Sequence, residues 1–301
     1  MRTKVVKTTG DHYWVVDESG QMHEVHAKGK MRMQGIRSTS PVVVGDWVQV
    51  QDGLITDIEN RNNYIIRRAS NLSKYSHILA ANIDQVFLFV TLVWPETAIE
   101  FVDRFLVTAE AYRVPVILVF NKVDLYTPAE EARYAALRQI YEPLGYVCQR
   151  MSLTLGEGVR QLQDRLAGKV TLLAGNSGVG KSSLMNILDP NLAVRTGEVS
   201  QVHGKGMHTT TFTQMFPISD GYVIDTPGIK GFGVVDLQAT DIAKCFPEML
   251  RLADRCKFHN CTHTHEHGCA VIDAWQRGEI ADSRYDSYVS ILSDMDQSKY
   301  R

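Results

Sequence analysis

The residues best suited to chemistry form one run at positions 175–182, which reads Gly-Asn-Ser-Gly-Val-Gly-Lys-Ser. In this Gly-x4-Gly-Lys-Ser pattern, glycines let several backbone N–H groups converge on phosphate oxygens at a helix N-terminus. Lys181 would neutralise the β- and γ-phosphates, and the Ser182 hydroxyl would coordinate Mg²⁺. The alternative is a glycine-rich turn that binds nothing. The predicted phosphate-binding residues are Gly175, Asn176, Ser177, Gly178, Val179, Gly180, Lys181, Ser182 and Ser183.

A second motif, Asn-Lys-x-Asp at positions 121–124, has the chemistry to select a base. The Asp124 carboxylate only accepts hydrogen bonds, so it matches the adjacent N1–H and N2 donors of guanine, whereas adenine has no donor at either place. Asn121 would tie the loop to neighbouring backbone and to the base edge. The Lys122 stem would cover one face of the base. Four residues alone are a weak pattern, which gains weight from sharing the chain with the phosphate loop.

Two further loops carry groups that such a site needs. Ser152 lies where guanine-binding folds have a loop whose backbone N–H donates to guanine O6, although Leu153 replaces the usual alanine. The run Asp-Thr-Pro-Gly follows a strand-like segment and ends at Gly228. There Asp225 can hold the Mg²⁺ shell, and the Gly228 N–H can meet the γ-phosphate.

Residues 204–211 read Gly-Lys-Gly-Met-His-Thr-Thr-Thr, a glycine-containing segment with the threonines that a γ-phosphate sensor needs. Ile229 follows Gly228 and cannot hydrogen-bond to water, so another group must position the attacking water. His208 is the candidate, because an imidazole both donates and accepts. The alternative is an ordinary loop with a solvent-facing histidine.

The spacing Cys256-x4-Cys261-x-His263-x5-Cys269 is typical of a metal site. Three thiolates and one imidazole make a closed tetrahedral zinc site, which is structural because no position remains for a reacting water. The alternative is reduced cysteines in a small core. The identity of the fourth ligand is open because three other histidines lie nearby: His259, His265 and His267.

The elements that must position these groups alternate between strands and helices from residue 85 onwards. Apolar runs at 85–90, 114–120 and 170–174 are typical of buried parallel strands, and two of them lead directly into the motifs. This alternation predicts an α/β fold with a parallel sheet that binds ligands at the carboxyl ends of its strands. Further strands are expected at 146–148, 213–216 and 222–224, and helices at 99–112, 129–142, 156–167, 183–188, 242–255 and 275–295.

Residues 1 to about 70 predict a small β domain, either an OB-type or an SH3-like barrel. The expected strands are 13–16, 22–25, 42–44, 47–50 and 54–58. The basic segment 28–37 is either an RNA-gripping loop or a solvated charged loop. Nearby positive charge favours RNA and comes from Arg61, Arg67, Arg68 and Lys74. The polar stretch 71–83 is expected to be a connection.

Composition indicates a globular chain of more than one domain: 301 residues, 44% hydrophobic and 22% charged. The formal net charge of −2 excludes a polycation, so any nucleic-acid contact must come from local patches. No apolar run approaches the roughly 20 residues that span a bilayer, and the first ten residues lack a signal-peptide core. We therefore expect a cytoplasmic protein with no membrane partner. Five cysteines, three of them within fourteen residues, favour metal over disulfides.

The order of the motifs is informative, because the base motif precedes the phosphate loop, whereas in common small GTPases it follows. The same sheet forms if the chain is cut and rejoined elsewhere, so the order predicts a circularly permuted P-loop GTPase. The expected domains are an RNA-binding barrel domain of the OB or SH3-like type at 1–72, the permuted GTPase domain at 73–235 and a zinc-binding helical domain at 236–301.

With these residues laid out, the chain resembles the ribosome small-subunit-dependent GTPase A family (RsgA, also called YjeQ or YloQ) along nearly its whole length. The resemblance rests on Gly-Asp-Trp-Val at 45–48, both nucleotide motifs, residues 208–211, Asp-Thr-Pro-Gly at 225–228 and the Cys/His cluster, all in the family's order. It implies an OB-fold, a permuted GTPase domain and a zinc-binding domain.

The resemblance also implies a function. GTP would be hydrolysed to GDP and phosphate, stimulated by the small (30S) ribosomal subunit, during late bacterial assembly of that subunit with its 16S rRNA. Mg²⁺ would bind Ser182 and a switch threonine, for which Thr210 is chosen over Thr209. The expected catalytic residues are then His208, Thr210 and Lys181, in a monomer.

Three other functions stay open. The chain can act mainly as a GTP-controlled RNA-binding placeholder whose hydrolysis is only a timer. It can be a permuted GTPase of large-subunit assembly, which the barrel and the cysteine cluster disfavour. A zinc-dependent hydrolase is disfavoured because the cluster has four strong protein ligands.

Overall fold

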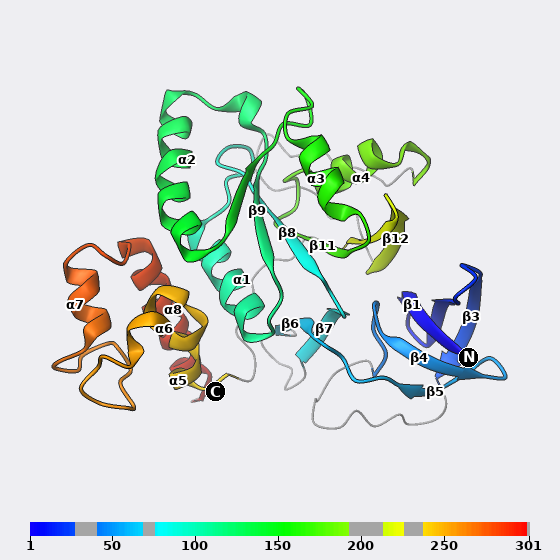
Figure 1. The fold of residues 1–301 in the computed structure, drawn as a ribbon, viewed down its shortest axis with the longest axis horizontal. Coiled ribbons are helices and arrows are strands. Elements are labelled where there is room, and N and C mark those ends of the chain that lie inside the picture. The colour runs from blue at the N-terminus through cyan, green and yellow to red at the C-terminus, as the bar shows by residue number, and fades with distance from the viewer. Residues whose placement is uncertain (28–40, 69–75, 193–212, 226–236, 300–301) are drawn as a thin grey trace.

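The computed structural model describes residues 1–27, 41–68, 76–192, 213–225 and 237–299. Within these ranges a barrel and a group of C-terminal helices lie on opposite sides of a central sheet (Figure 1). Several predicted features lie outside the described residues: the basic segment 28–37, Lys74, His208, Thr210, Gly228 and Ile229.

Among the described residues, six strands form the central sheet, and five of them run parallel. Their order is β10 (Val147–Arg150), β9 (Val116–Phe120), β8 (Gln85–Val90), β11 (Val170–Ala174), β13 (Gly221–Asp225) and β12 (Gln214–Ile218). The last strand, β12, pairs antiparallel with β13. Every residue of β8, β9 and β11 is buried, because helices cover both faces of these strands. The strands expected at 85–90 and 170–174 are confirmed residue for residue.

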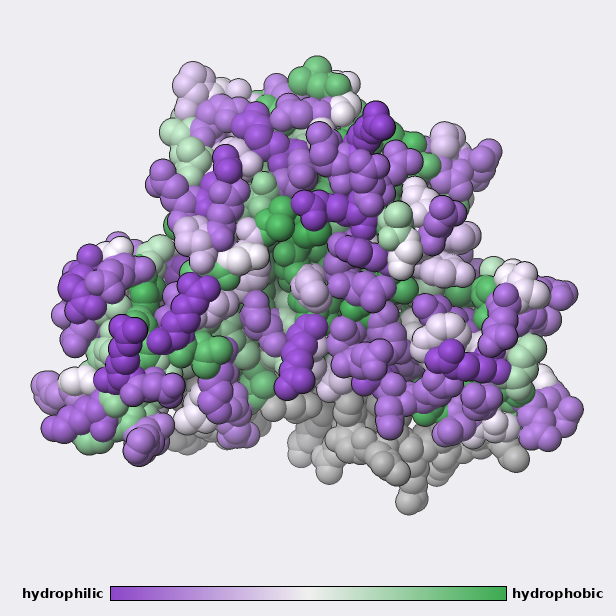
Figure 2. All heavy atoms as spheres, viewed as in Figure 1, coloured by the Kyte–Doolittle hydropathy of each residue, from purple (hydrophilic) through white to green (hydrophobic). Residues whose placement is uncertain are grey.

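Helices on both faces divide the side chains of the sheet between two hydrophobic cores. In β8, Val86 and Leu88 pack in the core beneath α1 and α2, whereas Phe87 and Phe89 pack in the core beneath α3 and α4. On the face seen in Figure 2, hydrophobic residues gather over the central strands, between hydrophilic surfaces. The four helices are α1 (Ile99–Ala111), α2 (Pro128–Tyr141), α3 (Val159–Leu166) and α4 (Lys181–Leu188).

Five N-terminal strands close into an OB-like barrel in the order β1-β2-β3-β5-β4-β1, with β3 and β5 parallel. Lys7 of β1 also pairs with Gln214 of β12, so the barrel continues into the central sheet. The barrel strands are β1 (Arg2–Thr9), β2 (His12–Val16), β3 (Met22–Ala27), β4 (Trp47–Gln51) and β5 (Leu54–Ile58).

The strand expected at 42–44 is wrong, and β1 supplies the fifth barrel strand instead. The three valines of 42–44 are buried in a turn, where the Asp46 carboxylate accepts from the Val43 N–H at 2.9 Å. Lysines interrupt the apolar pattern of β1, so this strand has no continuous hydrophobic run that would predict it. Their ammonium groups lie over indole rings: Lys4 is 4.7 Å from the Trp47 centroid, and Lys7 is 4.8 Å from the Trp14 centroid.

In the part of the chain that the structure describes, a second sheet consists of β6 (Tyr64–Arg68) and β7 (Ser76–Ala81), an antiparallel pair that lies between the barrel and the central sheet in the sequence. The polar stretch expected to be a connection therefore contains a strand. Arg61, expected to add RNA-facing charge, is buried instead, with 8% of its side chain exposed. Its Nε and Nη2 donate to the Asp46 carboxylate at 2.6 and 2.7 Å. Burial raises the pKa of Asp46, and the Arg61 charge opposes that rise.

Among the described residues, the C-terminal part contributes four α-helices to a hydrophobic core of its own, which also includes Val107 of α1. The helices expected at 242–255 and 275–295 are divided differently, because Gly278, at φ +74°, lies in the turn between the last two. These helices are α5 (Ala239–Ile242), α6 (Pro247–Ala253), α7 (Ala270–Gln276) and α8 (Asp282–Lys299).

A buried ionic cluster joins these helices to the central domain. Arg284 of α8 donates to Asp103 of α1 at 2.7 Å and to both carboxylate oxygens of Glu248 of α6, at 2.6 and 3.2 Å. The Asp103 carboxylate also accepts from the hydroxyls of Tyr141, at 2.8 Å, and Ser287, at 2.7 Å. One guanidinium thus satisfies two carboxylates from two domains.

Replacing Arg284 by methionine tests this junction. Arg284→Met leaves two buried carboxylates without their cation, which costs about 3–5 kcal/mol for a broken buried pair. We expect a clearly lower thermal midpoint, measured by circular dichroism. The matched control is Arg277→Met, because Arg277 forms an exposed pair with Glu279 at 2.7 Å. Equal midpoints for the two variants would contradict this account.

Candidate nucleotide-binding site

The phosphate loop connects the end of β11 to the start of α4, at the carboxyl edge of the parallel strands. Two of its glycines are required by their surroundings. A Cβ at Gly175 (φ +135°) would lie 2.8 Å from the Phe89 carbonyl oxygen. At Gly180 (φ +107°) it would lie 2.3 Å from the Asn121 side-chain nitrogen. The loop therefore packs closely against the strand and the base motif beside it.

Lys181 begins α4 and turns its ammonium back over the loop. Its Nζ donates to the carbonyl oxygens of Gly175, at 2.9 Å, and Asn176, at 2.7 Å. Burial lowers the pKa of Lys181 to about 8, and the nearby Asp225 carboxylate partly offsets that effect. Asp225 ends β13, directly beside Leu173 of β11. A phosphate group here would find a buried cation and loop amides.

The base motif lies beside the phosphate loop and is bonded to it. Asn121 follows β9 and donates from Nδ2 to the Val179 carbonyl oxygen at 2.7 Å. Lys122 has a left-handed backbone (φ +65°), and its Nζ donates to the Trp94 carbonyl oxygen. Burial lowers the pKa of Lys122. The two motifs therefore form one continuous surface at the strand ends.

Asp124 is exposed, and a buried serine orients it. The Ser152 hydroxyl donates to Asp124 Oδ1 at 2.6 Å and accepts from the Leu155 N–H at 3.1 Å. The Ser152 N–H donates to the Glu157 carbonyl oxygen at 3.0 Å, so it is not available to guanine O6. The part that Ser152 plays in the structure is to hold Asp124. Sequence reasoning missed this contact and the Trp94 carbonyl, because both join segments distant in the chain.

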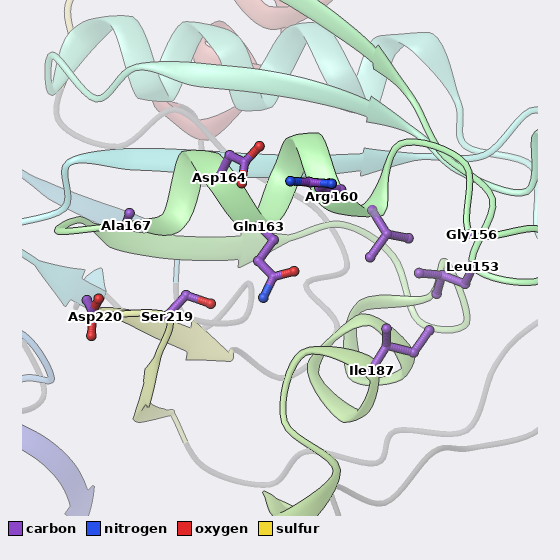
Figure 3. Close-up of a pocket in the computed structure, with 10 residues that line it drawn as sticks. Leu153, Gly156, Arg160, Gln163, Asp164, Ala167, Ile187, Ser219 and Asp220 are labelled. Atoms are coloured by element: carbon purple, nitrogen blue, oxygen red, sulfur yellow. The ribbon is translucent and has the colours of Figure 1, made fainter.

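A groove of about 740 Å³ opens beside this site, between α3, α4 and the turn linking β12 to β13. Figure 3 shows Leu153 and Ile187 near one end and Ser219 and Asp220 at the other. Leu153, which directly follows Ser152, lines the groove, whereas the phosphate-loop residues do not. The groove is therefore a neighbour of the nucleotide site and not part of it.

The four predicted metal ligands come together in the C-terminal part. Ligand atoms of Cys256, Cys261, His263 and Cys269 all lie within 4.8 Å of one another. His263 Nδ1 is 3.3 Å from Cys269 Sγ and 3.6 Å from Cys256 Sγ, and the last two sulfurs are 4.0 Å apart. A tetrahedral zinc site has ligand separations of about 3.6–3.8 Å. The cluster therefore fits a structural metal.

Surrounding groups fix the cluster and select its histidine. The Tyr285 hydroxyl donates to the His263 carbonyl oxygen at 2.8 Å, and His263 is buried with a left-handed backbone (φ +56°). Burial raises the pKa of the Cys261 thiol, so a metal ion must displace the thiol proton. The other three histidines considered as the fourth metal ligand are exposed and lie outside the cluster: His259, His265 and His267.

Comparison with known proteins identifies the family. The family model described as RsgA GTPase matches residues 58–235. The chain belongs to the RsgA GTPase family. Proteins named "Small ribosomal subunit biogenesis GTPase RsgA" from Bacteroides fragilis (strain YCH46) and Porphyromonas gingivalis (strain W83) are each 53% identical to it. They cover 100% and 99% of this chain, which spans 99% and 98% of theirs.

Solved structures of the RsgA family share the fold. YjeQ from Thermotoga maritima matches with a TM-score of 0.76 at 33% identity, covering 97% of each chain. YloQ, described as a circularly permuted GTPase, matches with a TM-score of 0.71 at 27% identity, covering 98% of this chain and 95% of its own. The permuted GTPase fold inferred from motif order is confirmed. No helix in the described residues is long and apolar enough to cross a membrane.

Ser152→Ala tests the orientation of Asp124. The variant removes one hydrogen bond to a charged group, worth about 1.5–3 kcal/mol, so GDP affinity should fall about tenfold or more while ADP binding stays equally weak. The control is Thr154→Ala, in the same loop and exposed. Isothermal titration calorimetry supplies both affinities. Unchanged GDP affinity in Ser152→Ala would remove this serine from the site.

Proposed function

We propose that this GTPase acts on the small ribosomal subunit during late assembly, contacts its 16S rRNA and hydrolyses GTP to GDP and phosphate there. The observation that carries the nucleotide part is the hydrogen bond of 2.7 Å from Asn121 Nδ2 to the Val179 carbonyl oxygen, which joins a guanine-selective motif to a phosphate loop. Support for the ribosomal part comes from relatives named for small-subunit biogenesis that match over the full chain.

The exposed Asp124 carboxylate recognises guanine by accepting hydrogen bonds from N1–H and the N2 amino group of the base. The Ser152 hydroxyl holds this carboxylate in place. Because the Ser152 N–H is already used, we assign the O6 contact to the next amide, that of Leu153. Lys122, whose ammonium is fixed by the Trp94 carbonyl, lays its stem along the base. Unpaired acceptors would penalise adenine.

The phosphates bind the loop amides of 175–183 and the Lys181 ammonium, which must leave its two carbonyl partners to meet them. Two side chains offer the oxygen ligands that Mg²⁺ prefers: Ser182 in the first turn of α4 and Asp225 at the end of β13. That ion would neutralise charge between the β- and γ-phosphates. The remaining assignments are Thr210 to Mg²⁺, the Gly228 N–H to the γ-phosphate and His208 to the attacking water.

The remaining proposals concern organisation. We divide the chain into domains at 1–72, 73–235 and 236–301; the first boundary falls between β6 and β7, so this hairpin belongs to both neighbours. The OB-like barrel and the basic segment 28–37 supply the rRNA contact. The protein works as a cytoplasmic monomer.

The metal at Cys256, Cys261, His263 and Cys269 is zinc, one ion per chain. Cys269 also accepts from the Ile272 N–H, so losing this ligand should loosen the start of α7. In Cys269→Ser, zinc content measured by elemental analysis should fall well below one, and limited proteolysis should cut the C-terminal part first. The control is Cys245→Ser, a buried cysteine outside the cluster. Freshly purified protein without zinc would refute the assignment.

Ribosome dependence is tested by measuring phosphate release with no subunit, with small subunits and with large subunits. Because Ile229 cannot orient water, the unaided rate should be near the roughly 10⁻⁴–10⁻² s⁻¹ of unassisted GTPases, and only small subunits should raise it by orders of magnitude. His208→Ala should lose most of that stimulation and keep GTP affinity. Stimulation by large subunits would overturn the proposed partner, whereas an unaffected His208→Ala would point to a water-positioning group from the ribosome.

A further inference from the structure

The outer face of the barrel carries a group of metal-ligand side chains that the GTPase activity does not use. His12 of β2 and His26 of β3 lie directly opposite one another, with ring centroids 4.9 Å apart. Glu24 lies two residues before His26 and therefore points to the same face of the strand. All three side chains are exposed. Two imidazoles and a carboxylate thus share one small patch of surface.

Distances within the patch suit a single ion. Glu24 Oε1 is 2.7 Å from His12 Nδ1, and one ligand atom from each residue lies within 4.8 Å of the other two. Ligands held about 2.0–2.2 Å from one ion are separated by roughly 3.3–3.6 Å in a tetrahedron. Small rotations of exposed side chains therefore reach binding geometry. An ion would replace two contacts among the described residues: the one between His12 and Glu24, and a weak one in which His26 Nδ1 lies 3.4 Å from the Asp11 carbonyl oxygen.

We propose that His12, Glu24 and His26 form a second metal site, which binds a divalent transition-metal ion such as Zn²⁺, Ni²⁺ or Cu²⁺. Imidazole nitrogens favour these ions, whereas Mg²⁺ and Ca²⁺ prefer all-oxygen ligands. Three protein ligands leave at least one position to water, so this site is open and exchanges with solvent. The cluster of three cysteines and His263 is closed, and it holds its ion more tightly.

The fold prepares the backbone of this site before any ion binds. Tyr13, one residue after His12, and Val25, one residue before His26, are also paired and are buried in the barrel core. A register slip of one residue would expose them, so the core fixes His12 opposite His26. An ion bound across the two strands would bind the folded barrel and not the unfolded chain, and it would therefore raise the melting temperature.

The test uses the full-length protein with its C-terminal cluster saturated with zinc and excess zinc removed. Titration with Ni²⁺ in a calorimeter should show one exchangeable ion per chain. His12→Asn and His26→Asn should each abolish this binding, and Glu24→Gln should weaken it by about 10–100-fold. These side chains are exposed, so equal melting temperatures of the zinc-loaded proteins before Ni²⁺ is added will show that the variants fold.

Two controls separate this site from other histidines. His23→Asn changes a histidine in the same strand, β3, that pairs with Asp17 at 2.7 Å, and it should bind Ni²⁺ as the unaltered protein does. His265→Asn changes an exposed histidine near the cysteine cluster and should also have no effect. The proposal is overturned if the unaltered protein binds no Ni²⁺, if His12→Asn binds it equally well, or if His265→Asn removes the binding.

Discussion

The hydrogen bond from Asn121 Nδ2 to the Val179 carbonyl oxygen is the contact on which the nucleotide site depends. It joins the loop after β9 to the phosphate loop after β11, across a chain separation of 58 residues. Gly180 lies against the same amide, where any Cβ would be only 2.3 Å away. Base recognition and phosphate binding are therefore built on one shared surface, and neither loop can move far without the other.

This contact also explains why the permuted chain order does not matter to the chemistry. A parallel sheet places its loops by strand position and not by sequence order. β8 lies between β9 and β11, and β13 lies on the other side of β11, so both motifs and Asp225 meet at one edge. Permutation changes which part of the chain follows each strand in the sequence. Here the C-terminal helices follow Asp225 in the sequence, and Arg284 joins them to α1.

Prediction from sequence succeeded where burial or chemistry leaves a local pattern. Strands β8 and β11 were placed residue for residue because both faces are buried, and the three cysteines and His263 were found because metal ligands have characteristic spacing. It failed where distant segments decide the outcome. The apolar run at 42–44 predicts a strand, but it is a turn that tertiary packing buries. The opposite holds for β1, which is a strand although lysines interrupt its apolar pattern.

Polar contacts between distant segments were the least predictable part of the site. Arg61 looked like a surface charge, and only the fold shows it buried against Asp46. The loop at Ser152 was expected to offer a backbone amide to guanine, and only the fold shows that the Ser152 amide itself is bonded to Glu157 while its hydroxyl holds Asp124. Side-chain type indicates what a residue can do, whereas its neighbours decide which of its groups remain available.

The most direct test of the central claim is the base preference of Asp124→Asn, measured as GDP and XDP affinities by calorimetry. Xanthine has a C2 carbonyl where guanine has the N2 amino donor, so an asparagine amide can donate where the carboxylate accepted. The account predicts that GDP binding falls and XDP binding rises, which reverses the preference by orders of magnitude. Equal weakening of both nucleotides, or unchanged GDP affinity, would contradict the claim that Asp124 reads the base.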